Sequence, residues 1–177
     1  MIVNQSDIQE KTTHISKTIA YKSTIILFIS ALFIAGCSQN GEFMLLNGEK
    51  RSLDDYQGSW VVVNFWAEWC SPCLEEVPEL NAIHNNEQVG DIQVIGVSFD
   101  PLDNQKISEI VIKWNIDYPV MASEPVPILP FGLPAQLPTN YLINPQGEVV
   151  KKLVGKQNAE SILKAIETIK SNKLSQI

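Results

Sequence analysis

The feature of the sequence that most constrains the fold is an apolar run that leads into two closely spaced cysteines. Residues 60–66, Trp-Val-Val-Val-Asn-Phe-Trp, form an almost continuous apolar stretch, which is typical of a strand buried on both faces of a sheet. Cys70 and Cys73 follow, and apolar residues then recur at helical spacing over about 71–85. The pattern predicts a buried strand, a turn and a helix that begins at the two cysteines.

A helix N-terminus is a favourable place for a reactive thiol. Its unpaired N–H groups and partial positive charge stabilise a thiolate. We therefore expect Cys70, at the edge of the turn, to be the exposed nucleophile. Cys73 lies one turn into the helix, where it can reach the Cys70 sulfur and act as the resolving thiol. Pro72 falls in the first helical turn, where its missing N–H costs nothing.

The cysteine pair has two other possible roles. A zinc site needs a second pair of ligands at suitable spacing, and only Cys37 and His84 are available. A purely structural disulfide with this spacing at the start of a helix would stabilise the fold only weakly. The residues favour redox chemistry, with no metal and no cofactor.

The rest of the chain alternates strand and helix patterns. The Asn-Gly pair at 47–48 favours a tight hairpin turn. The sequence predicts a hairpin over 43–53, strands over 92–99, 139–143 and 148–154, and helices over 104–114 and 157–170. The ten prolines include five between residues 125 and 138. This order predicts an α/β fold with a central mixed β-sheet flanked by helices and an added N-terminal β-hairpin.

The first residues form a candidate targeting segment. Lysines precede the apolar run 25–35, which is too short for a spanning helix of about 20 residues but suits a signal peptide. The run ends in Ala35-Gly36-Cys37, which resembles a bacterial lipobox. We expect a lipoprotein signal peptide at 1–36, a lipidated Cys37 with a short tether at 37–42, and a folded domain at 43–173. An ordinary signal peptide, an uncleaved anchor or an upstream start-site error remain alternatives.

Composition excludes some classes of protein. Thirteen basic and 20 acidic residues give a net charge of −7, which argues against a nucleic-acid binder. Three cysteines are too few for a disulfide-rich scaffold. We expect a monomer in the bacterial cell envelope, anchored on the extracytoplasmic side of a membrane, that faces the periplasm or the cell surface.

The motifs around the cysteines carry a family resemblance. Residues 63–73 resemble the active-site strand and helix start of thioredoxins. The longer signature Trp69-Cys-x-Pro-Cys-x-x-Glu76-x-Pro78, with Leu137-Pro138-Thr139 later in the chain, is similar to the TlpA/ResA-like redoxins of the AhpC/TSA type. These are thioredoxin-fold, membrane-anchored thiol-disulfide oxidoreductases. The resemblance covers about residues 43–170.

The resemblance implies roles for individual residues. Cys70 and Cys73 match the redox pair, and Pro138 matches the cis-proline that packs beside it. This geometry would leave the backbone of Leu137 free to pair with a substrate strand. Glu76 matches the acid that moves protons during exchange.

Other positions near the motif are interpreted more simply. Thioredoxins have a buried Asp where this chain has Asn64, which shifts proton transfer to Glu76. Trp69 flanks the cysteine and is expected to shield the site or contact substrate, whereas Trp60, Trp66 and Trp114 are expected in the core. Glu68 and Glu76 should oppose thiolate formation. Two interpretations of the Pro-rich segment 124–137 stay open. Its apolar residues Ile128, Leu129, Phe131 and Leu133 either border the groove over the dithiol and contact an extended polypeptide, or the segment is a surface linker packed on its own domain.

The resemblance implies a reductant of disulfides in exported proteins, for example in cytochrome c maturation, supplied with electrons by a membrane thiol donor. A peroxiredoxin-type thiol peroxidase is one alternative, but its Pro-x-x-x-Thr-x-x-Cys context is missing before Cys70. A copper chaperone on the same fold is another, but the related carriers use Cys-x-x-x-Cys with a later His, and no His follows His84.

Overall fold

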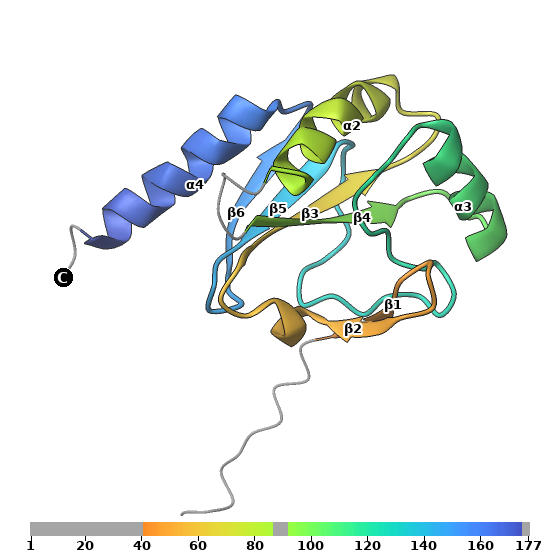
Figure 1. The fold of residues 1–177 in the computed structure, drawn as a ribbon, viewed down its shortest axis with the longest axis horizontal. Coiled ribbons are helices and arrows are strands. Elements are labelled where there is room, and N and C mark those ends of the chain that lie inside the picture. The colour runs from red at the N-terminus through yellow and green to blue at the C-terminus, as the bar shows by residue number, and fades with distance from the viewer. Residues whose placement is uncertain (1–40, 87–91, 175–177) are drawn as a thin grey trace, which may run out of the picture. The chain divides into compact units, whose positions relative to one another are not determined.

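The computed structural model describes residues 41–86 and 92–174 (Figure 1). The candidate signal peptide and Cys37 lie outside these residues, so the lipoprotein assignment stays a prediction. Within the described residues, no helix is both long enough and apolar enough to cross a membrane.

The centre of the domain is a four-stranded mixed sheet with the order β4-β3-β5-β6. Its strands are β3 (Trp60–Trp66), β4 (Ile92–Ser98), β5 (Thr139–Ile143) and β6 (Val149–Val154). Strand β3 is parallel to β4 and antiparallel to β5, and β6 is antiparallel to β5. Every residue of β3 is buried, which explains why the apolar run in the sequence shows no alternation.

Three helices, α2 (Ser71–His84), α3 (Asn104–Lys113) and α4 (Ala159–Leu174), contribute to one core layer against this sheet (Figure 1). Helix α2 contributes Val77, Leu80 and Ile83 to this core, and α3 contributes Ile107 and Ile110. The same core holds both cysteines of the motif. The sheet and the helices confirm the predicted α/β fold.

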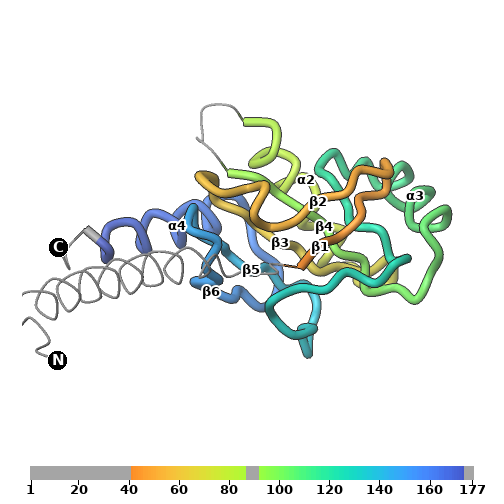
Figure 2. Tube along the Cα trace, turned by 90° about the horizontal axis from the view of Figure 1, so that it is seen from below, coloured from red at the N-terminus to blue at the C-terminus, as the bar shows by residue number. Residues whose placement is uncertain are grey.

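The opposite face of the sheet is covered differently. The hairpin of β1 (Glu42–Met44) and β2 (Lys50–Ser52), the short 3-10 helix η2 (Leu53–Tyr56) and the Pro-rich segment contribute to the core there. Figure 2 shows the hairpin beside the chain that follows β4 and α3; Ala122 N donates to Met44 O at 2.7 Å. The predicted hairpin is confirmed, and its turn has Gly48 at φ 85°, where a side chain would be strained.

One core prediction was wrong. Trp114 is 38% exposed, because it caps α3 at its C-terminus and the chain turns away at Asn115, whose φ is 51°. The ammonium of Lys113 lies 5.5 Å from the centroid of the Trp114 ring. Ile116, which follows this turn, is the buried residue there.

Candidate redox site

Cys70 and Cys73 form a disulfide at the N-terminus of α2. The S–S distance is 2.06 Å and the Cα atoms are 5.3 Å apart. Cys70 is the N-cap residue in an extended conformation, and its carbonyl accepts hydrogen bonds from the N–H groups of Cys73 and Leu74 at 2.9 and 3.2 Å. Pro72 lies in the first turn. The pair therefore occupies the strand-to-helix junction that the sequence predicted.

The expected exposure of Cys70 is not seen in the disulfide form. Cys70 is 5% exposed and Cys73 is 2% exposed. Both pack into the core that also contains Trp66 and Ala67, and a hydrogen bond from Cys70 N to Ala67 O at 3.1 Å closes the turn between β3 and α2. Trp69, one residue before Cys70, is 70% exposed, which suits the predicted contact with a partner.

The late Leu-Pro-Thr motif meets the same end of the sheet. The Leu137–Pro138 peptide bond is cis, as the resemblance implied. Strand β5 begins immediately after Pro138, and its Thr139 pairs with Phe65 near the end of β3. Leu137 is half-buried against both core layers. The fold thus brings the two distant motifs to the same end of the two central strands.

Glu76 is completely buried on α2, one helical turn after Cys73. Its Oε1 accepts hydrogen bonds from Asn140 Nδ2 at 2.6 Å and from Gln157 N at 3.2 Å. Its Oε2 is buried and has no hydrogen-bond partner. Burial raises the pKa of Glu76 from 4.5 to about 7, and the two hydrogen bonds hold it from rising further. The carboxyl group can therefore gain or lose a proton near neutral pH.

A chain of buried amides fixes the orientation of this carboxyl group. Asn140 lies opposite Asn64 in the β3–β5 register, and its Oδ1 accepts from Asn64 Nδ2 at 2.9 Å. The Oδ1 of Asn64 accepts in turn from the Tyr118 hydroxyl at 3.3 Å. Each side chain in this series donates a hydrogen bond to the next, from Tyr118 through Asn64 and Asn140 to Glu76. Oε1 is consequently an acceptor, and the proton of the neutral acid belongs on Oε2.

Three members of this network, Asn140, Gln157 and Tyr118, were not predicted from the sequence. The available signal was the amide of Asn140 within a strand whose next three residues are apolar or aromatic, because a buried amide needs partners. Gly96, which pairs with Asn64 from β4, was not predicted either. A Cβ at Gly96 would stand 3.0 Å from the Tyr118 ring, so the glycine provides the space that Tyr118 occupies.

The charge of Glu68 is partly balanced. Its carboxylate pairs with Lys113 at 2.8 Å; the Lys113 side chain is well exposed and that of Glu68 is partly exposed. Its effect on the thiols should therefore be weaker than the sequence suggested. In the residues that the structure describes, no three His, Cys, Asp or Glu side chains are grouped to hold a metal ion.

A Cys-x-x-Cys disulfide at the N-terminus of the helix after a central strand, with a cis-proline directly before the neighbouring antiparallel strand, is typical of thioredoxin-fold thiol-disulfide oxidoreductases. Comparison with known proteins supports this class. Residues 37–152 match the AhpC/TSA family. The thiol-disulfide oxidoreductase ResA of Geobacillus kaustophilus is 30% identical over 156 residues, which cover 86% of this chain and 88% of that protein. ResA of Bacillus cereus is 30% identical over 117 residues, 66% of this chain and 67% of that protein.

Solved structures show the same fold. A putative thioredoxin from Neisseria meningitidis has a TM-score of 0.61 at 28% identity, over 74% of this chain and 87% of that one. A putative thiol:disulfide interchange protein DsbE from Chlorobium tepidum has a TM-score of 0.59 at 26% identity, over 72% and 87%. The chain belongs to the AhpC/TSA family, as a TlpA/ResA-like thiol-disulfide oxidoreductase.

Proposed function

We propose that this protein is an extracytoplasmic reductant that transfers two electrons from the Cys70–Cys73 dithiol to disulfides of exported proteins, for example during cytochrome c maturation. The observation that carries the proposal is the buried Glu76 carboxyl group, which has a free Oε2 one turn after Cys73 and a pKa of about 7. Such a group can accept the proton that the resolving thiol must lose.

The first half of the cycle forms a mixed disulfide. The Cys70 thiolate, at the helix N-terminus, attacks one sulfur of the substrate disulfide. The new bond joins Cys70 to the substrate, the substrate S–S bond breaks, and the other substrate sulfur leaves as a thiolate that takes a proton from water. The exposed Trp69 and the Leu137 backbone beside the cis Pro138 are proposed to position the substrate chain.

The second half of the cycle releases the substrate. Ionised Glu76 takes the proton of the Cys73 thiol on Oε2, and the Cys73 thiolate attacks the Cys70 sulfur. The Cys70–Cys73 bond forms as the bond to the substrate breaks, and the second substrate thiolate is released and protonated. A membrane thiol donor then returns two electrons and two protons to the oxidised pair.

The residues between the cysteines favour reduction over oxidation. Ser71 and Pro72 bring no positive side chain to the thiols, unlike the sites of strong oxidants, where the cysteine pKa is as low as about 3.5. When the buried carboxyl group of Glu76 is ionised, its negative charge disfavours a thiolate on the nearby cysteines. We therefore place the pKa of the Cys70 thiol at or above the value of about 7 that is known for thioredoxin.

Equilibration in glutathione buffers tests the direction of electron flow. The expected reduction potential lies far below the about −120 mV of strong oxidants, and thiol alkylation across pH should give a Cys70 pKa near or above about 7. A potential near −120 mV with a Cys70 pKa below about 5 would reverse the proposed direction. Hydrogen peroxide consumption or stoichiometric copper binding would instead favour the peroxidase or the copper carrier.

The proposal also includes the N-terminal segment. We propose that residues 1–36 are removed as a signal peptide, that Cys37 carries the lipid, and that the domain over 43–173 works close to the membrane surface. The five residues between Cys37 and Phe43 can extend at most about 17 Å. The substrates and the thiol donor would therefore be met at the bilayer.

A further inference from the structure

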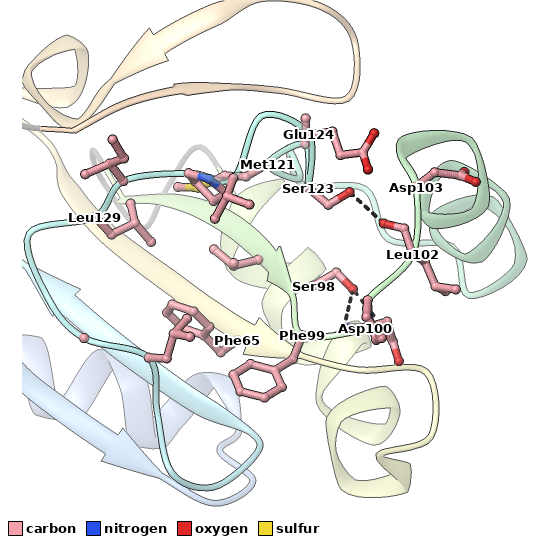
Figure 3. A pocket seen from close by; sticks show the side chains of 18 of the residues that line it. Phe65, Ser98, Phe99, Asp100, Leu102, Asp103, Met121, Ser123, Glu124 and Leu129 are labelled. Atoms are coloured by element: carbon pink, nitrogen blue, oxygen red, sulfur yellow. Dashed lines mark hydrogen bonds between the residues drawn. The ribbon is translucent and has the colours of Figure 1, made fainter.

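A pocket of about 800 Å³ lies on the face of the sheet opposite the core that contains α2, α3 and α4 (Figure 3). In the part of the chain that the structure describes, this face is covered by the hairpin, η2 and the Pro-rich segment, with no α-helix among them. The pocket lies between this covering and the sheet, since residues of both line it. The floor of the pocket is apolar and consists of Phe65, Val97, Met121, Leu129 and Phe131.

The Pro-rich segment divides its apolar residues between the pocket floor and the surface. Phe131 stacks on Tyr141 with ring centroids 4.4 Å apart, and Leu129 is half-buried, so both belong to the floor. Val126, Ile128 and Leu133 also line the pocket but are 79%, 74% and 76% exposed. Ile128, Leu129, Phe131 and Leu133, the four residues expected either at the dithiol groove or packed on the domain, all line this pocket, and Leu129 and Phe131 also pack onto the sheet. The exposed three form an apolar rim.

The other end of the pocket is acidic. Asp100, Asp103 and Glu124 line it, and no lysine or arginine does. Figure 3 shows Asp103 and Glu124 away from the end where Leu129 and Phe65 lie. Glu124 is exposed and takes part in none of the salt bridges among the described residues, whereas Asp103 caps α3 by accepting from Lys106 N at 2.8 Å and also interacts with the Lys106 charge. The pocket is thus complementary to a group that combines an apolar part with a positive charge.

The pocket is connected to the redox site through the backbone. Asp100 Oδ2 accepts a 2.8 Å hydrogen bond from the N–H of Glu68, two residues before Cys70. Phe99 N donates to Trp66 O at 2.7 Å. In Figure 3 the end of β3 passes beside Phe99 and Asp100 before the chain enters α2. A polypeptide bound at Cys70 can therefore extend around this end of the sheet into the pocket.

We propose that the pocket is a docking subsite for the polypeptide substrate. It takes a bulky apolar side chain on its floor and an adjacent lysine or arginine at its acidic end. Prolines at 125, 127 and 130 fix φ in the rim, which reduces the conformational entropy lost on binding. The inference rests on the proposed function only in that the docked polypeptide carries the disulfide that Cys70 attacks. Binding to the pocket does not itself need thiol chemistry.

Binding of a cysteine-free peptide to the oxidised protein tests the subsite alone. Two fluorescent dodecapeptides are compared by anisotropy, one of alternating Leu and Lys and one of alternating Leu and Glu. The Leu-Lys peptide should bind at least about tenfold more tightly. Leu133→Asp, at the apolar rim, and Glu124→Lys, at the acidic end, should each weaken its binding by about tenfold.

The chain offers matched controls for both substitutions. Ile112 on α3 is 76% exposed, as Leu133 is, and it does not line the pocket, so Ile112→Asp introduces the same charge on an equally exposed side chain elsewhere. Glu160→Lys reverses an exposed charge on α4. Both control variants should bind the Leu-Lys peptide as the wild type does.

Several outcomes would overturn the inference. Equal affinity for the two peptides, equal loss in the pocket and control variants, or binding of a small apolar dye in the pocket without any peptide binding would each do so. A second measurement separates this failure from a failure of the proposed function. The pocket variants should lose about tenfold in kcat/KM on a Leu-Lys peptide disulfide but keep the wild-type rate on a small aromatic disulfide. Loss on neither substrate would contradict the subsite alone, whereas a wild type inactive on both would contradict the proposed function.

Discussion

Asn140 donates a 2.6 Å hydrogen bond from Nδ2 to Oε1 of Glu76, and both side chains are completely buried. This contact joins β5 to the helix that carries the cysteines. It leaves Oε2 as the carboxyl oxygen without a hydrogen-bond partner. The orientation of the acid, and therefore the atom that exchanges the proton, follows from a strand far away in the sequence.

Replacing Asn140 should change the acidity of Glu76. The hydrogen bond from Asn140 lowers the pKa of Glu76 below the value that burial alone would give. Asn140→Leu should therefore raise this pKa above about 7 and move the pH midpoint of substrate release by about one unit to the alkaline side. The rate of release from a preformed mixed disulfide, measured by stopped flow across pH, reports the midpoint.

A double variant provides the control for this prediction. In a Glu76→Gln background, Asn140→Leu should leave the pH profile unchanged, because no carboxyl group remains to titrate. A persistent shift in that background would mean that Asn140 acts on the thiols by another route. An unchanged midpoint in the single variant would contradict the role of Asn140 in positioning Glu76.

The stability of the oxidised protein should fall as Glu76 ionises. Its folded pKa of about 7 lies above the ordinary 4.5, so its neutral form is favoured in the fold. The resulting stability is complete below pH 4.5 and is lost as pH rises through about 7, by up to about 3 kcal/mol. Urea unfolding at pH 5 and pH 9 should show this loss in the wild type and a smaller loss in Glu76→Gln. Glu75→Gln, on an exposed partner of Lys156, should retain the wild-type loss.

The stability of the fold should depend on the absence of a side chain at Gly96. A Cβ there would lie 3.0 Å from both the Tyr118 ring and Val120, and 3.1 Å from Trp66 Nε1. Gly96→Ala should therefore lower the free energy of unfolding by roughly 1–3 kcal/mol through overpacking. Gly132→Ala is the matched control, since a Cβ at Gly132 meets no atom within 4 Å. Equal stability of the two variants in urea would show that the space beside Tyr118 is not restrictive.

The N-terminal prediction is tested in cells. If Cys37 is lipidated, the protein should partition into membranes, and Cys37→Ser should release it or block its processing. Two acyl chains anchor a protein durably, whereas one binds only marginally. A wild-type protein that stays in the soluble fraction with residues 1–36 intact would contradict the prediction.

The sequence predicted the parts of the fold that depend on local pattern. The apolar run 60–66 and the cysteines at the helix start are adjacent in the chain, so spacing alone located them. Tyr118, Asn140 and Gln157 reach Glu76 only through the strand register and the loop before α4, which no local pattern reveals. The burial of Cys70 was missed for the same reason, because the packing around the disulfide depends on the whole core.

The lining of the pocket also could not be predicted from local sequence pattern. Composition showed that the segment 124–137 is rich in proline and apolar residues, but not which of them face the sheet. Leu129 and Phe131 are held there by contacts with the sheet, including Tyr141. Leu133 and Ile128 remain outside and could be identified as a rim only from the structure.

The most direct test of the proposed cycle is the mass of the species that accumulates when the resolving thiol is removed. Reduced Cys73→Ala, mixed with a protein that contains one disulfide, should accumulate a stoichiometric mixed disulfide whose tryptic peptides join Cys70 to the substrate. Cys70→Ala, under the same conditions, should accumulate none. An adduct on Cys73 in the Cys70→Ala variant, or substrate release from Cys73→Ala at the wild-type rate, would contradict the assignment of Cys70 as the attacking and Cys73 as the resolving thiol.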